Sequence, residues 1–198
     1  NNGQSCIAAK RFILHEAIAD EFEAAFVERV QALTVGDPFD PATDIGPLAA
    51  DYLRDTLARQ VEETVAAGAR VLVGGHLLDR PGFFYAPTVL TDIPPGTPAR
   101  CEELFGPVAA LFRVASREEA LALANDTPYG LGASVWTQND AEAEFFIANL
   151  EAGNVFVNGL VKSDPRLPFG GVKASGYGRE LGVHGIREFV NVKTVWKG

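Results

Sequence analysis

The 198-residue chain has 47% hydrophobic and 22% charged residues, a composition typical of a globular protein with a sizeable core. Its formal net charge of −9 argues against nucleic acid and anionic membranes as partners, because both carry charge of the same sign. No apolar run approaches the roughly 20 residues that cross a bilayer, and the opening residues resemble no signal peptide, so we expect a cytoplasmic protein.

The first part of the chain is predicted to contain two helices and a strand. Apolar residues recur at helical spacing over 16–33, and a second helix over 51–69 is expected to end at Gly68. The segment 36–47 between them is rich in Gly, Pro and Asp, which indicates a long loop. A β-branched run followed by two glycines predicts a strand over 70–75.

Further along, predicted strands alternate with predicted helices. Ser116 and Glu119 have the spacing of a capping box, and Asn139 or Asp140 is expected to cap the next helix, which Gly153 ends. Strands are expected at 83–90, 107–114, 131–137 and 154–158. This alternation indicates an α/β fold with largely parallel strands.

The cysteines and histidines limit the kinds of site that the chain can form. Cys6 and Cys101 form no disulfide framework, and the three histidines, His15, His76 and His184, show no metal-ligand spacing. We therefore expect no metal site.

Cys6 is a candidate nucleophile within the segment NNGQSC. Gly3 relaxes the backbone before it, and the run CIAAK after it favours a short helix. A thiol at a helix N-terminus feels the positive end of the helix dipole, which favours the thiolate. Composition and spacing alone also allow a buried structural cysteine.

Four segments carry a resemblance that favours the first alternative. They are NNGQSCIAAKR, EELFGPV, NDTPYGLGASVWT and PFGGVKASGYGRE, in this order along nearly the whole chain. Together they resemble the active-site and signature motifs of the aldehyde dehydrogenase family.

The resemblance implies a fold and an organisation. It implies a three-layer α/β/α catalytic domain over 1–185 and an oligomerisation strand over 186–198, with a homodimer or homotetramer as the full-length assembly. By itself, the segment 189–198 fits equally well as an edge strand of its own sheet. The N-terminal dinucleotide-binding domain of the family is absent from these residues. The chain has no Met and opens within a motif, so we expect a fragment that works with the N-terminal half of the same enzyme.

The resemblance also implies residue roles. Cys6 attacks the aldehyde carbon, and its backbone N–H stabilises the oxyanion. Glu103 binds the nicotinamide ribose of NAD or NADP, and Phe105 packs near the nicotinamide. Phe169 lines the substrate tunnel. The family's general base and second oxyanion donor precede the catalytic cysteine, and Cys101 matches no required thiol.

The substrate is indicated by the loop NGLVKSDPRLPFGG, which most resembles bacterial succinate-semialdehyde dehydrogenases. In that group a serine at the position of Ser163 holds the substrate carboxylate. Lys162 or Arg166 could add charge, because a guanidinium grips a carboxylate in bidentate fashion. Both can equally be surface charges on an exposed loop, and another small aldehyde stays an alternative substrate.

Two other functions remain open at this stage. Cys6 could act as a thiol esterase without a nicotinamide cofactor, with His15 as the nearest histidine in sequence. The chain could also be a non-catalytic relative that serves as an interaction module, although an intact pair of Cys6 and Glu103 argues against this.

Overall fold

The structure is a computed structural model that describes all 198 residues, and the chain forms two compact units, residues 1–124 and 125–198. The predicted catalytic range, 1–185, spans the first unit and most of the second. None of the helices has the length and apolar character needed to cross a membrane.

The first unit is built on a four-stranded sheet in the order β1-β4-β3-β2. Its strands are β1 (Arg11–His15), β4 (Val108–Val114), β3 (Thr88–Thr91) and β2 (Arg70–Val73). β4 runs parallel to both β1 and β3, and β2 runs antiparallel at the edge. The prediction of a largely parallel sheet is therefore confirmed.

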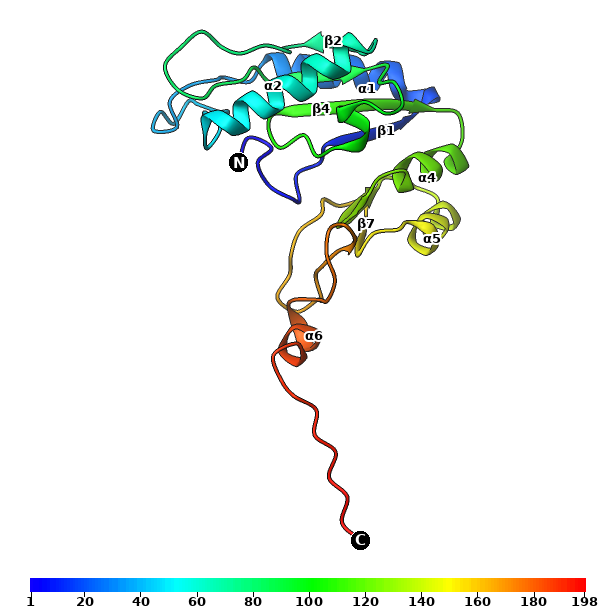
Figure 1. The fold of residues 1–198 in the computed structure, drawn as a ribbon. Coiled ribbons are helices and arrows are strands. Elements are labelled where there is room, and N and C mark those ends of the chain that lie inside the picture. Colours follow the sequence, from blue (N-terminus) through cyan, green and yellow to red (C-terminus); the bar gives the residue numbers. More distant parts are fainter. The chain divides into compact units, whose positions relative to one another are not determined.

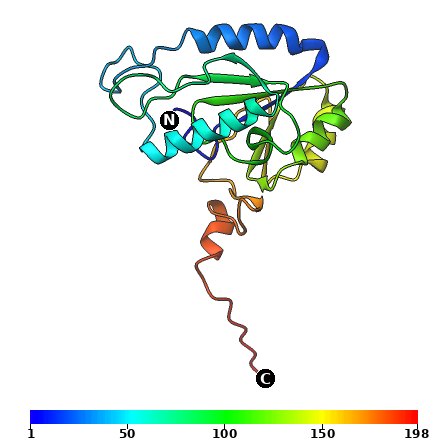
Figure 2. The same ribbon diagram turned by 45° about the horizontal axis from the view of Figure 1, so that its top comes forward.

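Two long helices cover this sheet. Helix α1 (Glu16–Gln31) lies on one face and helix α2 (Asp51–Ala66) on the other, with the sheet between them (Figures 1 and 2). Gly68 follows α2 with a φ of +119°, a conformation that suits glycine after a helix end. The predicted three-layer α/β/α arrangement is present in this unit.

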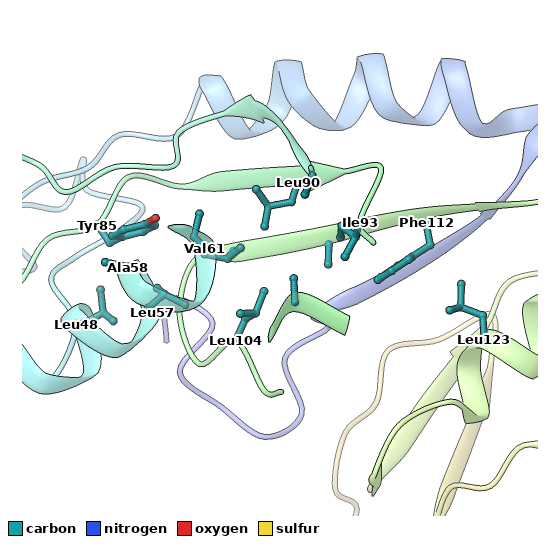
Figure 3. Close-up of a cluster of buried hydrophobic side chains, with 14 of the residues drawn as sticks. Leu48, Leu57, Ala58, Val61, Tyr85, Leu90, Ile93, Leu104, Phe112 and Leu123 are labelled. Atoms are coloured by element: carbon teal, nitrogen blue, oxygen red, sulfur yellow. The ribbon is translucent and has the colours of Figure 1, made fainter. Parts of the chain in front are cut away.

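The main core lies between α2 and the sheet (Figure 3). Leu57 and Val61 of α2 belong to one buried cluster with Leu90 of β3, Phe112 of β4 and Tyr85. Each buried side chain of this size contributes about 1.5–3 kcal/mol to stability. The core thus fixes the positions of α2 and β4 relative to each other.

A cluster of phenylalanines packs α1 onto the opposite face of the sheet. The ring of Phe12 in β1 lies 5.0 Å from that of Phe26, and Phe22 stacks 5.5 Å from Phe26. These centroid distances are in the favourable range for aromatic pairs. The contacts fix β1, the strand that directly follows the Cys6 segment.

The bounds predicted for one strand are wrong. The strand expected over 83–90 begins only at Thr88, and the residues before Pro87 make a single bridge between Tyr85 and Leu77. Proline lacks the N–H that a central ladder needs, so pairing starts after it. A short helix, α3 (Pro98–Cys101), follows β3.

The capping predictions are confirmed for both following helices. Before α4 (Arg117–Asn125), the N–H of Glu119 donates to Ser116 Oγ at 3.1 Å, and the Glu119 carboxylate accepts from the N–H of Ala115 at 2.8 Å. Asn139 caps α5 (Asp140–Asn149) by accepting two backbone N–H groups through its side chain.

The second unit contains two small two-stranded sheets. β6 (Gly132–Val135) pairs in parallel with β7 (Asn154–Val157), and β5 (Tyr129–Gly130) pairs antiparallel with β8 (Val172–Lys173). Helix α6 (Gly182–Arg187) follows. These elements hold the loop between β7 and β8, which carries the predicted substrate residues.

The last residues, 190–198, form no helix and no strand in this chain. Val192 and Trp196 in this segment, and Phe189 just before it, are almost fully exposed. The oligomerisation strand stays a prediction, because it would need a second chain as its partner.

Candidate active site

The Cys6 loop is seated on the backbone that follows Glu103. Gly3 has a φ of +74°, and a Cβ placed on it would lie 2.0 Å from the carbonyl oxygen of Gly106. Only glycine permits both this conformation and this approach. The two sequence motifs NNGQSC and EELFGPV therefore meet through their glycines.

Two amide side chains fix the start of the same loop. Asn2 donates from Nδ2 to the carbonyl of Pro47 at 3.1 Å and accepts the N–H of Gly46 at 3.2 Å. Gln4 accepts the N–H of Ala49 at 2.9 Å. These bonds tie the loop to the segment that precedes α2. Sequence reasoning assigned no role to Asn2, because its spacing offered no signal for one.

Cys6 is exposed, which excludes the alternative of a buried structural cysteine. The helix expected after it is wrong: a turn from Ser5 to Ala8 leads directly into β1. The run of helix-forming residues is too short to pay the cost of nucleation, and pairing of β1 with β4 prevails. The helix-dipole argument for the thiolate therefore does not apply. Cys101 is also exposed.

Lys10 connects the loop to Glu103. Its ammonium donates to the carbonyls of Ser5 at 2.8 Å and Ala8 at 3.2 Å, and it lies 3.3 Å from Oε1 of Glu103. The ammonium is also 5.5 Å from the centre of the Phe105 ring. Cys6 lies between the two residues that Lys10 holds, so its loop and the carboxylate form one bonded group. Sequence reasoning missed this lysine.

Gln60 holds the same segment from the other side. This side chain of α2 is only 5% exposed, and its Nε2 donates to Glu102 Oε2 at 2.8 Å and to the carbonyl of Glu103 at 3.2 Å. Arg59 adds an ion pair to Glu102 at 3.5 Å. Glu103 is thus positioned through its backbone by α2 and through its carboxylate by Lys10.

An open pocket of about 330 Å³ includes Phe105 in its lining but not Cys6, Lys10 or Glu103. Its lining residues come from the Cys6 loop, the start of α2 and the segment after Glu103: Asn1, Asn2, Gln4, Ala49, Leu53 and Phe105. A half-buried carboxylate beside an aromatic ring suits a sugar diol attached to a flat heterocycle, because a carboxylate accepts hydrogen bonds from both hydroxyls. The residues present therefore fit the nicotinamide end of NAD or NADP.

The second unit carries Ser163 and Arg166 on one exposed loop. The guanidinium of Arg166 binds Asp164 through two bonds, at 2.9 and 2.6 Å, while remaining 85% exposed. The side chain and N–H of Arg166, with a smaller contribution from Lys162, lower the pKa of Asp164 to about 2. The Arg166 guanidinium, which was expected to bind the substrate carboxylate, is thus already paired with Asp164 of the same loop.

Phe169, the predicted tunnel residue, is buried. Its N–H and carbonyl both bond to Glu180 at 2.8 Å. The next residue, Gly170, lies so close to Gly153 that a Cβ on Gly153 would sit 1.9 Å from its carbonyl oxygen, and Asn154 donates to that oxygen at 2.9 Å. The PFGG motif is therefore held by close backbone contacts to the start of β7.

The sequence pattern of the aldehyde dehydrogenase family matches residues 1–195. The chain belongs to the aldehyde dehydrogenase family. A succinate-semialdehyde dehydrogenase [NADP(+)] of Mycobacterium tuberculosis is 58% identical over 196 residues, which cover 99% of this chain and 43% of that relative. The chain thus spans less than half the length of the curated relatives it matches.

Solved aldehyde dehydrogenases have the same fold. Succinic semialdehyde dehydrogenase from Streptococcus pyogenes, in complex with NADP+, matches with a TM-score of 0.94 and 37% identity over 99% of this chain and 43% of that one. Aldehyde dehydrogenase 21 from Physcomitrella patens, in complex with the reaction product succinate, matches with a TM-score of 0.89 and 35% identity over 94% and 38%. The family resemblance and the fold class deduced from the sequence are confirmed.

Proposed function

We propose that the whole protein oxidises an aldehyde to a carboxylic acid with a nicotinamide cofactor, through a covalent bond to Cys6. The observation that carries this proposal is the bonded group formed by the exposed Cys6 loop, Lys10 and Glu103. The aldehyde dehydrogenase resemblance assigns two parts of this chemistry to these residues. Cys6 is the nucleophile, and Glu103 is the carboxylate that binds the ribose diol.

The thiolate of Cys6 attacks the carbonyl carbon and forms a thiohemiacetal. The backbone N–H of Cys6 stabilises the charge that develops on the aldehyde oxygen. A bound nicotinamide cofactor would supply the hydride acceptor for this carbon, which would leave a thioester to Cys6. Water then cleaves the thioester and releases the acid. Glu103 and Phe105 would hold and orient the nicotinamide end of the cofactor.

The cofactor that we propose is NADP. The Mycobacterium relative is named for NADP(+), and the Streptococcus structure holds NADP+. The family resemblance assigns most of the cofactor site to residues that precede the catalytic cysteine.

The substrate that we propose is succinate semialdehyde. The relatives named for this substrate and the succinate in the Physcomitrella structure support it. Ser163 is exposed and has a hydroxyl that can donate to the distal carboxylate. Arg166 would assist only if its pair with Asp164 opens. Another small aldehyde is the alternative.

The position of His15 does not favour it as the base that the thiol esterase alternative needs. His15 lies at the far end of β1, about 13 Å along the strand from Arg11. Its Nδ1 accepts the N–H of Ala17 at 3.2 Å as the cap of α1. The histidine nearest to Cys6 in sequence thus has a structural role.

The proposal is tested on the full-length protein with succinate semialdehyde and either NADP or NAD. Cys6→Ala should abolish formation of the reduced cofactor, whereas Cys101→Ala, which removes the other exposed thiol, should leave it unchanged. Equal activity of the Cys6 variant and the parent would exclude the proposal. The isolated 198 residues should produce no reduced cofactor, because the nicotinamide must be oriented for hydride transfer and the resemblance assigns most of the cofactor site to residues before the catalytic cysteine.

We also propose that the exposed apolar residues of 189–198 add as a strand to a sheet of a second subunit. Removing residues 190–198 from the full-length protein should then lower the molar mass measured by light scattering. An unchanged mass would show that the assembly, a homodimer or homotetramer, forms elsewhere.

A further inference from the structure

Lys10 has an unusual set of partners for a lysine at the edge of a site. Its side chain is only 14% exposed, and its ammonium is shared among two backbone carbonyls and one carboxylate. The carbonyls belong to Ser5 and Ala8, on either side of Cys6, and the carboxylate belongs to Glu103. Two of the three ammonium donors bond to the carbonyls, and the Glu103 carboxylate lies at ion-pair distance, 3.3 Å.

The ion pair is more than a surface contact. Glu103 is 38% exposed and its backbone is already held by Gln60, so its side chain is the part left to be oriented. Exposed pairs contribute little, but a largely buried ammonium that also satisfies two carbonyls loses its partners at a greater cost. Lys10 therefore fixes which way one oxygen of Glu103 points.

We propose that Lys10 is a positioning residue that acts through Glu103: it orients the carboxylate for the ribose of the nicotinamide cofactor and couples that carboxylate to the Cys6 loop. This inference rests on the proposed function. It adds that cofactor affinity depends on a lysine that belongs to the nucleophile loop and does not need to touch the cofactor.

The coupling has a direct consequence for binding. With Lys10 in place, Glu103 is already in one orientation before the cofactor arrives, so less conformational freedom is lost on binding. Without it, the carboxylate must be ordered by the cofactor alone. Cofactor binding weakens, while binding of the aldehyde changes little.

The test compares cofactor binding in the full-length protein, measured by the fluorescence of NADPH on titration. Lys10→Met should raise the Kd about tenfold, the loss expected for a hydrogen bond to a charged group. Lys10→Arg, which keeps the charge, should lose less. The KM for the cofactor should rise with the Kd, and the KM for the aldehyde should stay within about twofold of the parent value.

A double-mutant cycle separates this role from general stabilisation. In a Glu103→Gln background, Lys10→Met should have little further effect on the Kd, because the carboxylate it orients is gone. An equal effect in both backgrounds would overturn the proposal, as would an unchanged Kd in the single variant. If Lys10→Met does not fold, Lys10→Gln removes the charge and keeps a donor for a carbonyl.

Arg70→Met is the matched control, since Arg70 forms an exposed ion pair with Asp92 at 2.9 Å in the same unit. It should leave the Kd unchanged. The failure of the two proposals can be distinguished: a parent protein that binds no NADPH contradicts the proposed function. A parent that binds NADPH, with a Lys10 variant of equal affinity, contradicts the inference alone.

Discussion

The Cα of Gly3 faces the carbonyl oxygen of Gly106 so closely that a Cβ on Gly3 would lie 2.0 Å from it. The obstacle is backbone, which cannot rotate away like a side chain. Gly3→Ala should therefore displace the loop, and a displacement of about 1 Å at the thiol costs about 100-fold in rate. We expect at least this loss in the rate of reduced-cofactor formation by the full-length protein.

Gly96 provides the control for this substitution. Its φ of +77° is close to that of Gly3, but a Cβ on it would meet nothing within 4 Å. Gly96→Ala should cost only the strain of the left-handed conformation, about 1–2 kcal/mol of stability, and leave the rate unchanged. If both variants lose activity alike, backbone strain and not the contact with Gly106 explains the effect.

Ser163→Ala tests how the substrate carboxylate is recognised. Loss of one hydrogen bond to a charged group should raise the KM for succinate semialdehyde about tenfold. An uncharged aldehyde of equal length should keep its KM, because it offers no carboxylate for the hydroxyl. Steady-state kinetics of both substrates provide the measurement. Equal changes for the two aldehydes would remove Ser163 from the substrate site.

The pairing of Arg166 with Asp164 leads to a separate prediction. The depressed pKa of Asp164 keeps its carboxylate charged above about pH 4 and lets the pair weaken only as the pH falls through about 2. The guanidinium thus stays occupied at neutral pH. Arg166→Ala alone should change the KM for succinate semialdehyde less than Ser163→Ala does.

Asp164→Asn then reveals whether Arg166 has a latent role. With its partner neutralised, the guanidinium becomes available to another carboxylate, and the KM for succinate semialdehyde should fall if Arg166 reaches the substrate. The double variant Asp164→Asn, Arg166→Ala should lose this gain. A KM that does not fall in Asp164→Asn would mean that Arg166 is a surface charge.

The elements were largely predictable where local signals agreed. The helix over 16–33 and the capping residues Ser116 and Asn139 follow from periodicity and side-chain chemistry, and the structure has them within a few residues. Strand β1 was not predicted. The run before it favours a helix locally, and the strand exists because it pairs with β4, which lies almost 100 residues later in the chain.

The site shows the same division. Cys6, Glu103 and Phe105 were chosen by resemblance to a family, which states roles without contacts. Lys10 and Gln60 were missed because their importance comes only from where folding places them. A lysine after a short apolar run has no distinguishing signal, and its contact with Glu103 joins residues that are distant in sequence. Such contacts form only when the sheet and α2 bring distant parts of the chain together.

The hydroxyl of Tyr85 is buried without a hydrogen-bond partner, in a side chain that is only 1% exposed. An unpaired buried hydroxyl carries a desolvation cost of about 1–3 kcal/mol. Tyr85→Phe removes the oxygen and keeps the ring within the core. We therefore expect the thermal midpoint of the full-length protein at neutral pH to stay the same or rise.

The same hydroxyl predicts how stability depends on alkaline pH. Burial, with a smaller contribution from Glu62, raises the pKa of Tyr85 from 10 to about 12. A raised pKa means that the phenol ionises more easily in the unfolded state than in the folded state. The free energy of unfolding of the parent is therefore unaffected below pH 10 and falls as the pH rises from 10 through 12. The advantage of Tyr85→Phe over the parent should therefore grow between pH 9 and pH 11.5 in thermal melts. A constant difference would show that the phenol reaches solvent or a hydrogen-bond partner in solution.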